Sequence, residues 1–364
     1  MAASFPERFV LKSDRCRLSG KSYAPKEAVA PGLGVVMVHG LLSASDVFDV
    51  KGREEMSLAR FLAGRGHHVV TYDQRGAGDS TAADWKFGLE THSLVDLPAV
   101  LALCRERFGF TRVVFVSHSL GGTIWLRYMH GRPMATPVPG PGVRDWADQP
   151  EIVGGAVLAS PPFFNHVDVP WSDIFDRGTS FIADIDHNRD GLVVREEFVR
   201  AQIALYQPRM AKLLLPRVLR WMLALGGRLT FVAGLLRRLP TPAVIYHPDD
   251  FDDGTFRRVL RSKMIDRGPL RLLEELYREI ADGPPDPIPP RLPFDGLAIG
   301  SRLDGFVPLA AVRRFGEQFQ TARVIATEDE FRVPSGHVGY LFKQGVREPT
   351  FKAVAEYLQQ FKRA

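Results

Sequence analysis

The sequence predicts an α/β protein with a mostly parallel, doubly wound sheet that is interrupted by a helical cap insertion. From residue 33 to residue 160, short apolar runs alternate with helical segments. Such alternation is typical of a parallel sheet with helices on both faces. It stops after residue 160 and returns near residue 294. We therefore expect an α/β core formed by residues 1–163 and 291–364, and a helical cap or lid at residues 164–290.

The expected strands are continuous apolar runs, because a strand buried on both faces needs no polar side. The run "RVVFVSH" at residues 112–118 is a clear example. On this basis we expect strands at residues 8–18, 33–39, 67–73, 112–118, 152–160, 294–301 and 322–327.

Helical segments separate these strands. Pro98 falls inside one of them, where it predicts a kink or a break because proline lacks the backbone N–H. The cap shows helical periodicity without an obvious buried strand, and the proline-rich stretch "DGPPDPIPPRLP" at residues 282–293 closes it. Outside the cap we expect helices at residues 53–65, 90–108, 120–130, 307–319 and 348–362.

Composition and charge narrow the class of protein. The chain has 364 residues, of which 45% are hydrophobic and 24% charged, as in soluble globular proteins. A net charge of +5 is too small to predict a nucleic-acid partner. Cys16 and Cys104 lie too far apart to suggest a disulfide framework. The N-terminus lacks the apolar region of a signal peptide, and no window resembles a membrane span. We therefore expect a cytoplasmic protein.

The stretch "SHSLGG" at residues 117–122 follows a buried strand and precedes a helix. A sharp turn at such a junction lifts its middle residue, Ser119, above the sheet. The flanking residues must be small, and Ser117 stands where glycine is usual. The N–H of Leu120, at the helix N-terminus, and that of Leu41, after the strand that ends in "HG", are candidate donors to an oxyanion. The alternative is an ordinary strand-to-helix turn.

A serine nucleophile needs a base, and the base needs an orienting acid. His337, in "PSGHVGY", follows the last expected strand, and Asp304, in "GSRLDGFVP", follows the strand before it. Both lie where the carboxyl ends of strands meet loops, which is the edge from which Ser119 emerges. Asp329 and Glu330 are alternative acids, but they follow a later strand.

Together these motifs resemble those of α/β-hydrolase-fold serine hydrolases, over residues 34–162 and 294–364. The resemblance implies that Ser119 is the nucleophile, His337 the base and Asp304 the acid, with backbone amides of Leu41 and Leu120 as the oxyanion hole. It rests on "VHGLL", "YDQRGAGDS", "SHSLGG", "GSRLDGFVP" and "SGHVGY".

Within that fold, "HGLLSASDVF" and "GHVGYLFKQGVREPTFKAVAEYL" resemble lipases and the polyhydroxyalkanoate-synthase-like branch. Those synthases carry cysteine at the nucleophile position, whereas this chain has Ser119, which favours hydrolysis. We therefore expect a hydrolase that cleaves carboxylic esters of an apolar acyl group through an acyl-enzyme. The alternatives are an acyltransferase with the same triad and a non-catalytic, calcium-responsive binding module. The expected partner is a small-molecule or lipid ester, without nucleic acid and without an organic cofactor.

The cap contains a second motif. "DHNRDGLVVREEF" at residues 186–198 fits the spacing of an EF-hand loop and resembles one, which predicts calcium as a structural or regulatory ion. Gly191 takes the position of the sharp turn. An acidic turn without a metal is the alternative, since no second loop is found. The expected oxygen ligands come from Asp186, Asn188, Asp190, the Leu192 carbonyl and Glu197.

A basic amphipathic segment follows at residues 209–239. It mixes leucine, tryptophan and valine with repeated arginine, and no acidic residue occurs between Glu197 and Asp249. Such a segment predicts either a lid whose apolar face covers the active site or peripheral contact with an anionic lipid surface. The two are compatible.

Overall fold

The computed structural model describes residues 6–134, 149–162, 190–197, 216–229, 248–262, 266–282 and 290–363, together with residues 185, 200, 231 and 264. Its centre is an eight-stranded sheet with the strand order β1-β2-β4-β3-β5-β6-β9-β10. Only β2 runs antiparallel to its neighbours, so the prediction of a mostly parallel sheet is confirmed. The strands are β1 (Glu7–Ser13), β2 (Cys16–Tyr23), β3 (Leu33–Val38), β4 (His68–Tyr72), β5 (Arg112–His118), β6 (Glu151–Leu158), β9 (Gly296–Gly300) and β10 (Ala322–Ala326).

The N-terminal segment differs from the prediction. A single strand at residues 8–18 was expected, but the chain forms the β1–β2 hairpin. The turn passes through Asp14, whose φ of +50° lies in the left-handed region that aspartate tolerates better than most residues. The chain reverses direction at this turn. The apolar residues on either side of Asp14 do not indicate the turn, so the sequence pattern predicts one strand.

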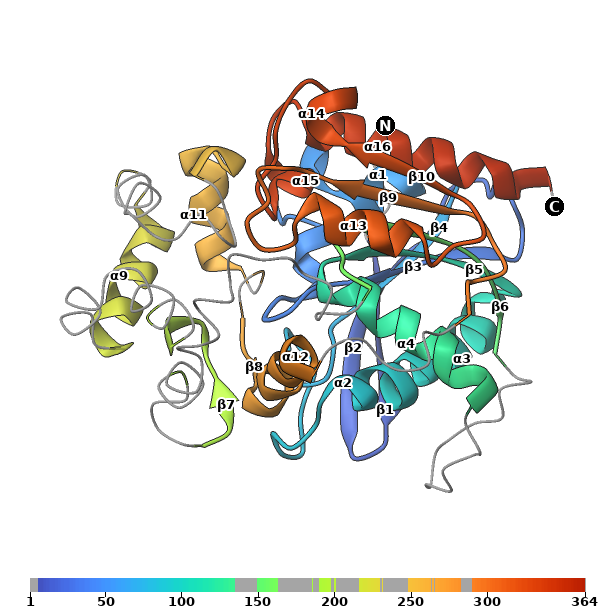
Figure 1. Ribbon diagram of the computed structural model, residues 1–364. Helices are drawn as coiled ribbons and strands as arrows, with labels where there is room; N and C mark the ends of the chain where they lie inside the picture. The colour runs from blue at the N-terminus through green and yellow to red at the C-terminus, as the bar shows by residue number, and fades with distance from the viewer. Residues whose placement is uncertain are drawn as a thin grey trace.

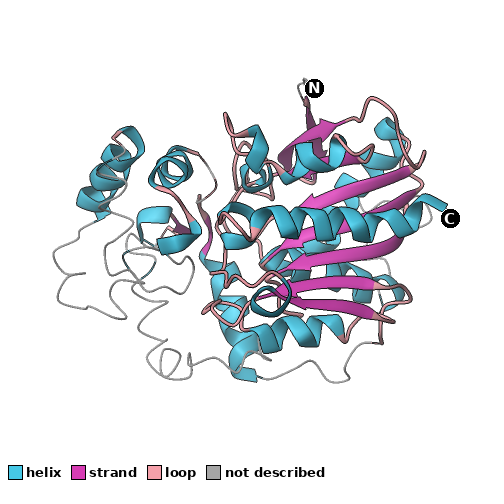
Figure 2. Cartoon of the chain, turned by 90° about the horizontal axis from the view of Figure 1, so that it is seen from above, coloured by secondary structure: helices cyan, strands magenta, loops and turns pink. Residues whose placement is uncertain are grey.

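Helices cover both faces of the sheet (Figures 1 and 2). Those of the core are α1 (Leu58–Ala63), α2 (Leu89–Thr91), α3 (Leu97–Phe108), α4 (Leu120–Met134), α13 (Leu309–Gly316), α14 (Thr327–Glu330), α15 (Gly339–Phe342) and α16 (Arg347–Gln359). The helix expected at 90–108 contains a π-helical turn at His92–Asp96, and Pro98 is the second residue of α3, directly after that turn.

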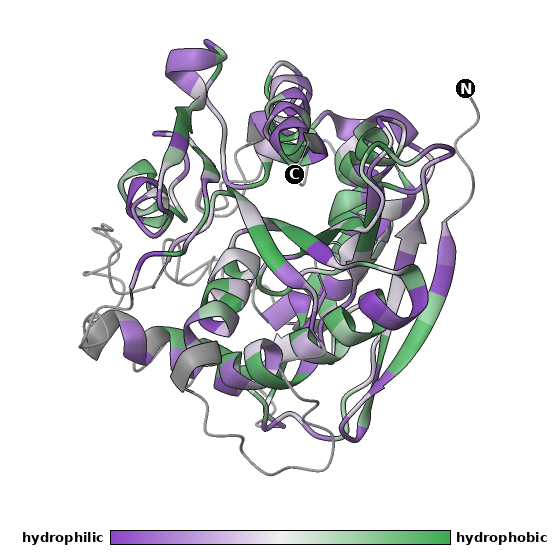
Figure 3. Ribbon diagram, turned by 90° about the vertical axis from the view of Figure 1, so that its right-hand side faces the viewer, coloured by the Kyte–Doolittle hydropathy of each residue, from purple (hydrophilic) through white to green (hydrophobic). Residues whose placement is uncertain are grey.

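Successive strand residues point to opposite faces, and each face has its own hydrophobic cluster. Val35 and Met37 of β3 pack in the cluster that includes residues of α1 and α16. Val36 and Val38 pack in the other cluster, with residues of α3, α4 and α13. The helices carry alternating apolar and polar bands, as amphipathic elements do (Figure 3). Both faces are therefore buried, which explains the continuous apolar runs.

The described part of residues 164–290 is mostly helical, with α9 (Pro216–Arg228), α11 (Asp253–Arg261) and α12 (Leu270–Asp282). It also contains one strand pair that was not expected, β7 (Leu192–Val193) with β8 (Gly268–Pro269), because two-residue strands leave no apolar pattern. Leu272 and Leu276 of α12 join the cluster formed by α3 and α4. The insertion therefore packs directly on the core.

Two further findings concern the described residues as a whole. No helix formed by these residues has both the length and the apolar character of a membrane span. Cys16 and Cys104 are both buried and both free.

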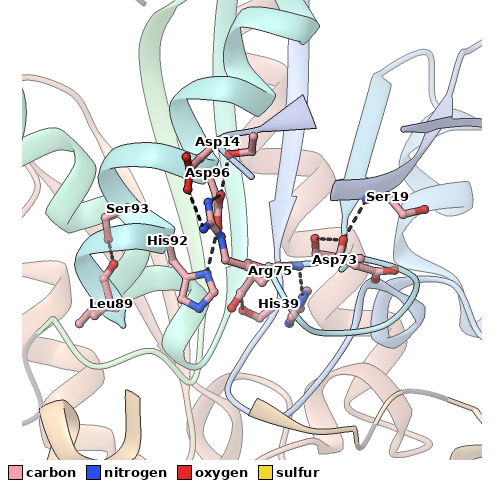
Figure 4. Close-up of polar contacts among 12 residues, drawn as sticks. Asp14, Ser19, His39, Asp73, Arg75, Leu89, His92, Ser93 and Asp96 are labelled. Carbon is pink, nitrogen blue, oxygen red and sulfur yellow. Dashed lines mark hydrogen bonds and ion pairs between the residues drawn. The ribbon is translucent and has the colours of Figure 1, made fainter. Parts of the chain in front are cut away.

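A buried ion-pair network ties the β1–β2 hairpin to the loop after β4 (Figure 4). The Arg75 guanidinium donates to Asp96, at 2.8 Å from Nη2 to Oδ1 and 3.2 Å from Nε to Oδ2. Ser13 Oγ donates to the same carboxylate at 2.7 Å, and His92 Nδ1 lies 3.5 Å away. Burial alone would raise the pKa of Asp96, but the contacts with His92 and Arg75 outweigh it and lower the pKa. The carboxylate is therefore ionised at neutral pH.

We expect Asp96→Asn to lower the free energy of unfolding at pH 7 by about 3 kcal/mol, because it leaves the buried Arg75 cation facing a neutral amide. Because the pKa of Asp96 is lower in the folded protein than the ordinary value of about 4, its ionised carboxylate stabilises the fold at pH values above about 4. This stabilisation is lost as the pH falls through the lowered pKa. The difference in the free energy of unfolding between wild type and Asp96→Asn, measured by urea unfolding, should therefore become smaller below about pH 4.

The control is Asp84→Asn, which removes an exposed carboxylate 3.4 Å from Arg15 and should change stability by less than about 1 kcal/mol. A gap between wild type and Asp96→Asn that is as wide at acid pH as at pH 7 would contradict the assignment of the network.

Candidate active site

Ser119 lies in the turn between β5 and α4. Its φ is +55°, an unusual conformation for a residue other than glycine and one expected of a sharp strand-to-helix turn. The Ser119 N–H donates to the Leu158 carbonyl of β6 at 3.0 Å, and its carbonyl accepts from the Gly122 N–H at 3.0 Å. These bonds fix the residue between two strands and the first turn of a helix.

The neighbours of Ser119 are small because the backbones crowd one another. A Cβ added to Gly121 would lie 2.1 Å from the Val38 carbonyl oxygen, and one added to Gly40 would lie 2.9 Å from Ser119 Cβ. Ser117, which stands where glycine is usual, is fully buried, and its Oγ accepts from Trp125 Nε1 at 3.0 Å. The serine therefore fits the turn and gives the buried indole N–H its acceptor.

The loops after β3 and β5 meet at the carboxyl edge of the sheet. The two strands pair in parallel, with Val38 opposite Ser117. Leu41 directly follows Gly40 in the first loop, and Leu120 is the first residue of α4, where backbone N–H groups have no helical acceptor. The structure thus brings the predicted oxyanion loop against the turn that holds Ser119.

His39 is a structural residue of this edge. The Gln74 N–H donates to His39 Nε2 at 3.0 Å, so the proton lies on Nδ1, which donates to the Gly40 carbonyl at 3.0 Å. Burial lowers the pKa of His39 to about 4, so the ring is neutral at physiological pH. It holds the loop after β3 against the loop after β4.

Asp304 and His337 come together from two different loops at the same edge. His337 Nδ1 lies 3.0 Å from Asp304 Oδ2, and both side chains are buried. The N–H groups of Phe306 and Val307 each donate to Asp304 Oδ1 at 2.9 Å. These two bonds fix the orientation of the carboxylate. The Phe306 ring packs on the imidazole, with 4.8 Å between the ring centroids.

The hydroxyl of Tyr340 is a further donor to the Asp304 carboxylate, at 3.4 Å from Oδ2. Burial and the nearby Asp304 charge raise the pKa of Tyr340 well above its ordinary value, so the phenol keeps its proton. Tyr340 was not among the residues predicted from the sequence, and only its place in "SGHVGY" pointed to the region.

His118 connects Ser119 to His337. Its Nε2 donates to the His337 carbonyl at 2.8 Å, and the two ring centroids are 4.9 Å apart. Burial, together with the neighbouring His337, lowers the pKa of His118 to about 3. The neutral ring therefore adds no positive charge beside His337. The His337 imidazole accordingly lies against the residue that immediately precedes Ser119.

Two aspartates of the insertion hold loops of the candidate site, and neither was predicted from the sequence. Asp250 is fully buried, and its Oδ1 accepts from the Gly336 N–H at 3.0 Å, next to His337. Asp266 Oδ2 accepts from the Gly78 N–H at 2.6 Å, in the loop after β4. The acidic stretch "HPDDFDDG" at residues 247–254, which lacks the spacing of a calcium loop, contains Asp250.

The alternative acids lie elsewhere. Asp329 pairs with Arg302, with 2.6 Å between Oδ2 and Nη2, and more than half of each side chain is exposed. Glu330 pairs with Arg323 at the surface. Of the three candidates, the structure brings only Asp304 into contact with His337.

The predicted calcium loop lies partly outside the described residues, which exclude Asp186 and Asn188. Gly191 has a φ of +77°, as its position in the motif requires. Asp190 Oδ1 accepts from the Leu192 N–H at 2.9 Å, and Glu197 Oε2 accepts from the Val194 N–H at 3.1 Å. Within the described chain, no three histidine, cysteine or acidic side chains cluster so as to hold a metal. The calcium site stays a prediction.

Comparison with known proteins agrees with this architecture. A family model described as the alpha/beta hydrolase fold matches residues 35–192, which include the turn at Ser119. The chain has the α/β-hydrolase fold. A search of curated proteins finds no match.

Solved structures share this α/β-hydrolase fold at low sequence identity. The epoxide hydrolase CorEH is 13% identical, with a TM-score of 0.55, and the alignment covers 98% of this chain and 99% of that one. A putative aryl esterase from Burkholderia cenocepacia is 14% identical, with a TM-score of 0.51 and the same coverage. A thermophilic esterase from Thermogutta terrifontis is 13% identical, with a TM-score of 0.50 and again 98% and 99% covered. At these identities the likeness shows the fold and not the reaction.

Proposed function

We propose that this α/β-hydrolase-fold protein is a serine hydrolase that cleaves carboxylic esters with an apolar acyl group. The observation that carries the proposal is the 3.0 Å contact between His337 Nδ1 and Asp304 Oδ2, next to the turn that holds Ser119. A serine, a histidine and a carboxylate from three loops of one sheet edge are the side chains that acyl transfer needs. Their order along the chain is that of α/β-hydrolases.

In the first half of the proposed reaction, Ser119 Oγ attacks the ester carbonyl carbon and its proton passes to His337 Nε2. Asp304 accepts from His337 Nδ1 and stabilises the resulting imidazolium. The oxyanion accepts from the N–H groups of Leu41 and Leu120. Collapse of the intermediate breaks the bond to the alcohol oxygen, which takes the proton from His337 and leaves an acyl-Ser119.

In the second half, water attacks the acyl carbon. His337 Nε2 takes the water proton, and the same two amides stabilise the second oxyanion. When this intermediate collapses, the bond to Ser119 Oγ breaks and the serine regains its proton from His337. The products are a carboxylic acid and an alcohol, so the atoms of one ester and one water are accounted for.

The exposed face of α9 supports an ester presented at a lipid surface. Leu219 and Leu223 are buried in the cluster that contains residues of α11. Val218 and Trp221 are 42% and 65% exposed, and their spacing of three residues places them on one face of the helix. Leu229, which directly follows the helix, is 41% exposed. With Phe231, which is 75% exposed, they are four of the few large apolar side chains at the described surface.

The charge around this apolar face favours an anionic lipid surface as its occupant. Arg220 and Arg228 of α9 are exposed, and so is Arg261 of α11, whose side chain would lie 3.1 Å from a Cβ added to Gly227. The sequence has no acidic residue from 198 to 248. Apolar side chains flanked by arginines are typical of helices that lie in the interface of an anionic bilayer.

We also propose that calcium stabilises the insertion through the loop at 186–197. The donors are oxygen atoms, which suit a hard cation, and Gly191 makes the turn that the loop needs. Asp190, the Leu192 carbonyl and Glu197 would hold the ion in the described half, and Asp186 and Asn188 in the other. The ion would supply structural stabilisation and takes no part in the steps above.

For the triad, we expect Ser119→Ala to abolish labelling by a fluorophosphonate probe and to lower kcat on p-nitrophenyl esters by at least about 10⁴-fold, because the nucleophile is lost. The matched control is Ser160→Ala, which removes another buried hydroxyl at the carboxyl end of a neighbouring strand. The proposal is refuted if Ser119→Ala is still labelled. It is also refuted if the folded wild type neither reacts with the probe nor hydrolyses any p-nitrophenyl ester. Products formed with a competing alcohol acceptor separate hydrolysis from acyl transfer.

For calcium, we expect saturating ion to raise the Tm by a few degrees, since a ligand at 100 times its Kd adds about 2.7 kcal/mol. Glu197→Gln should remove this response because it weakens the bidentate ligand at the last loop position. Glu196→Gln is the control, since that neighbouring buried carboxylate pairs with Arg195 at 3.0 Å instead. A Tm of wild type that is the same with calcium and with chelator would show that the loop is a turn without a metal.

For the lipid surface, we expect the protein to sediment with phosphatidylglycerol vesicles more than with phosphatidylcholine vesicles. Trp221→Ser should weaken this binding, and each of Arg220→Gln and Arg228→Gln should weaken it roughly fivefold, the equivalent of about 1 kcal/mol per cation. Val324→Ser, which changes an exposed valine of β10, should leave it unchanged. Equal binding to both vesicles, no binding to either, or self-association through α9 would each contradict this occupant.

A further inference from the structure

Leu42 has a backbone conformation that its surroundings must maintain. Its φ is +50°, in the left-handed region that costs a residue with a side chain roughly 1–2 kcal/mol. Such a conformation persists only where the surrounding contacts over-determine it. Leu42 directly follows Leu41, whose N–H is the proposed oxyanion donor. The contacts that hold Leu42 therefore act on the chain one residue away from this N–H.

The contacts on Leu42 come from the insertion. Its carbonyl accepts from the Asp266 N–H at 2.8 Å. Its side chain is buried in a small cluster with Ile185 and Val193. A Cβ added to Gly268 would lie 2.8 Å from Leu42 Cδ2, so glycine at this position lets β8 approach the leucine closely.

The same insertion segment is tied to two other loops. β8 pairs antiparallel with β7, with Val193 opposite Gly268. The Leu270 N–H donates to the Gly191 carbonyl at 2.9 Å, and Asp266 Oδ2 accepts from the Gly78 N–H at 2.6 Å. We name residues 266–270 together with β7 the β7–β8 brace. The brace connects the segment at 190–193 to the loop after β3 and to the loop after β4.

We propose that the β7–β8 brace is a positioning device for the oxyanion loop. Val193 and Asp266 hold Leu42 in its left-handed conformation, and Leu42 in turn orients the Leu41 N–H toward the acyl oxygen. This inference rests on the proposed function, because the direction of that N–H affects a rate only where an oxyanion forms.

The brace has a kinetic signature that a general loss of stability lacks. An oxyanion donor acts on the transition state more than on the bound ester, so its displacement lowers kcat and leaves KM nearly unchanged. Complete loss of one donor costs about 10²–10³-fold in kcat. We expect a displaced donor to cost about tenfold or more, and the affinity for a trifluoromethyl ketone, which forms an oxyanion on the serine, to fall in parallel.

The test compares Val193→Ala with Val354→Ala in the full chain. Both valines are fully buried, but Val354 lies in α16, within the large cluster on one face of the sheet. Val193→Ala should lower kcat and the ketone affinity about tenfold with KM changed less than twofold, whereas Val354→Ala should lose comparable stability and keep its kcat. Leu42→Gly is the second variant. Glycine adopts a positive φ freely, but it lacks the side chain that the brace holds, so it should show the same kinetic loss.

Hydrogen exchange at residues 39–44 provides a readout that does not need activity. Val193→Ala and Leu42→Gly should exchange faster there than wild type and Val354→Ala. Suppose that both variants have the same kcat, the same KM and the same exchange rates at residues 39–44 as Val354→Ala. The brace then does not position this loop. If wild type hydrolyses no ester and is not labelled, the proposed function fails, and the exchange rates alone then support or overturn the brace.

Discussion

The close packing of the Ser119 turn against the end of β3 is the constraint on which the rest of this structure depends. The backbone at Gly121 leaves no space for a Cβ beside the Val38 carbonyl. Since β3 and β5 pair in register, the loops after the two strands must meet at one edge of the sheet. The turn places a serine hydroxyl and the first N–H groups of α4 at that edge. Every other component of the candidate site is positioned relative to this contact.

The insertion contributes contacts to both sides of the candidate site rather than only a cover. Asp250 holds the loop that carries His337, and Asp266 holds the loops after β3 and β4. Each carboxylate accepts from a backbone N–H, which fixes main-chain position without depending on the side chains of the loop. Direct hydrogen bonds therefore join the core edge to the insertion.

Burial keeps three titratable groups of this edge neutral. His118 and His39 are held neutral by lowered pKa values, and Tyr340 keeps its proton. Asp304 instead accepts hydrogen bonds from two backbone N–H groups and from the Tyr340 hydroxyl. In the proposed reaction, the Asp304 carboxylate would face the positive charge that develops on His337, from the position in which it also orients the ring.

The sequence by itself determined the sheet core and the candidate nucleophile, because strand burial and the turn at Ser119 depend on residues that are neighbours in the chain. It also indicated Asp304 and His337 through their places after strands, although their contact joins positions 33 apart. Only the tertiary structure decided the N-terminal hairpin and the roles of Asp250 and Asp266. Those two carboxylates bind amides 86 and 188 positions away. Such bonds leave no periodic pattern in a sequence, because donor and acceptor meet only when the chain has folded.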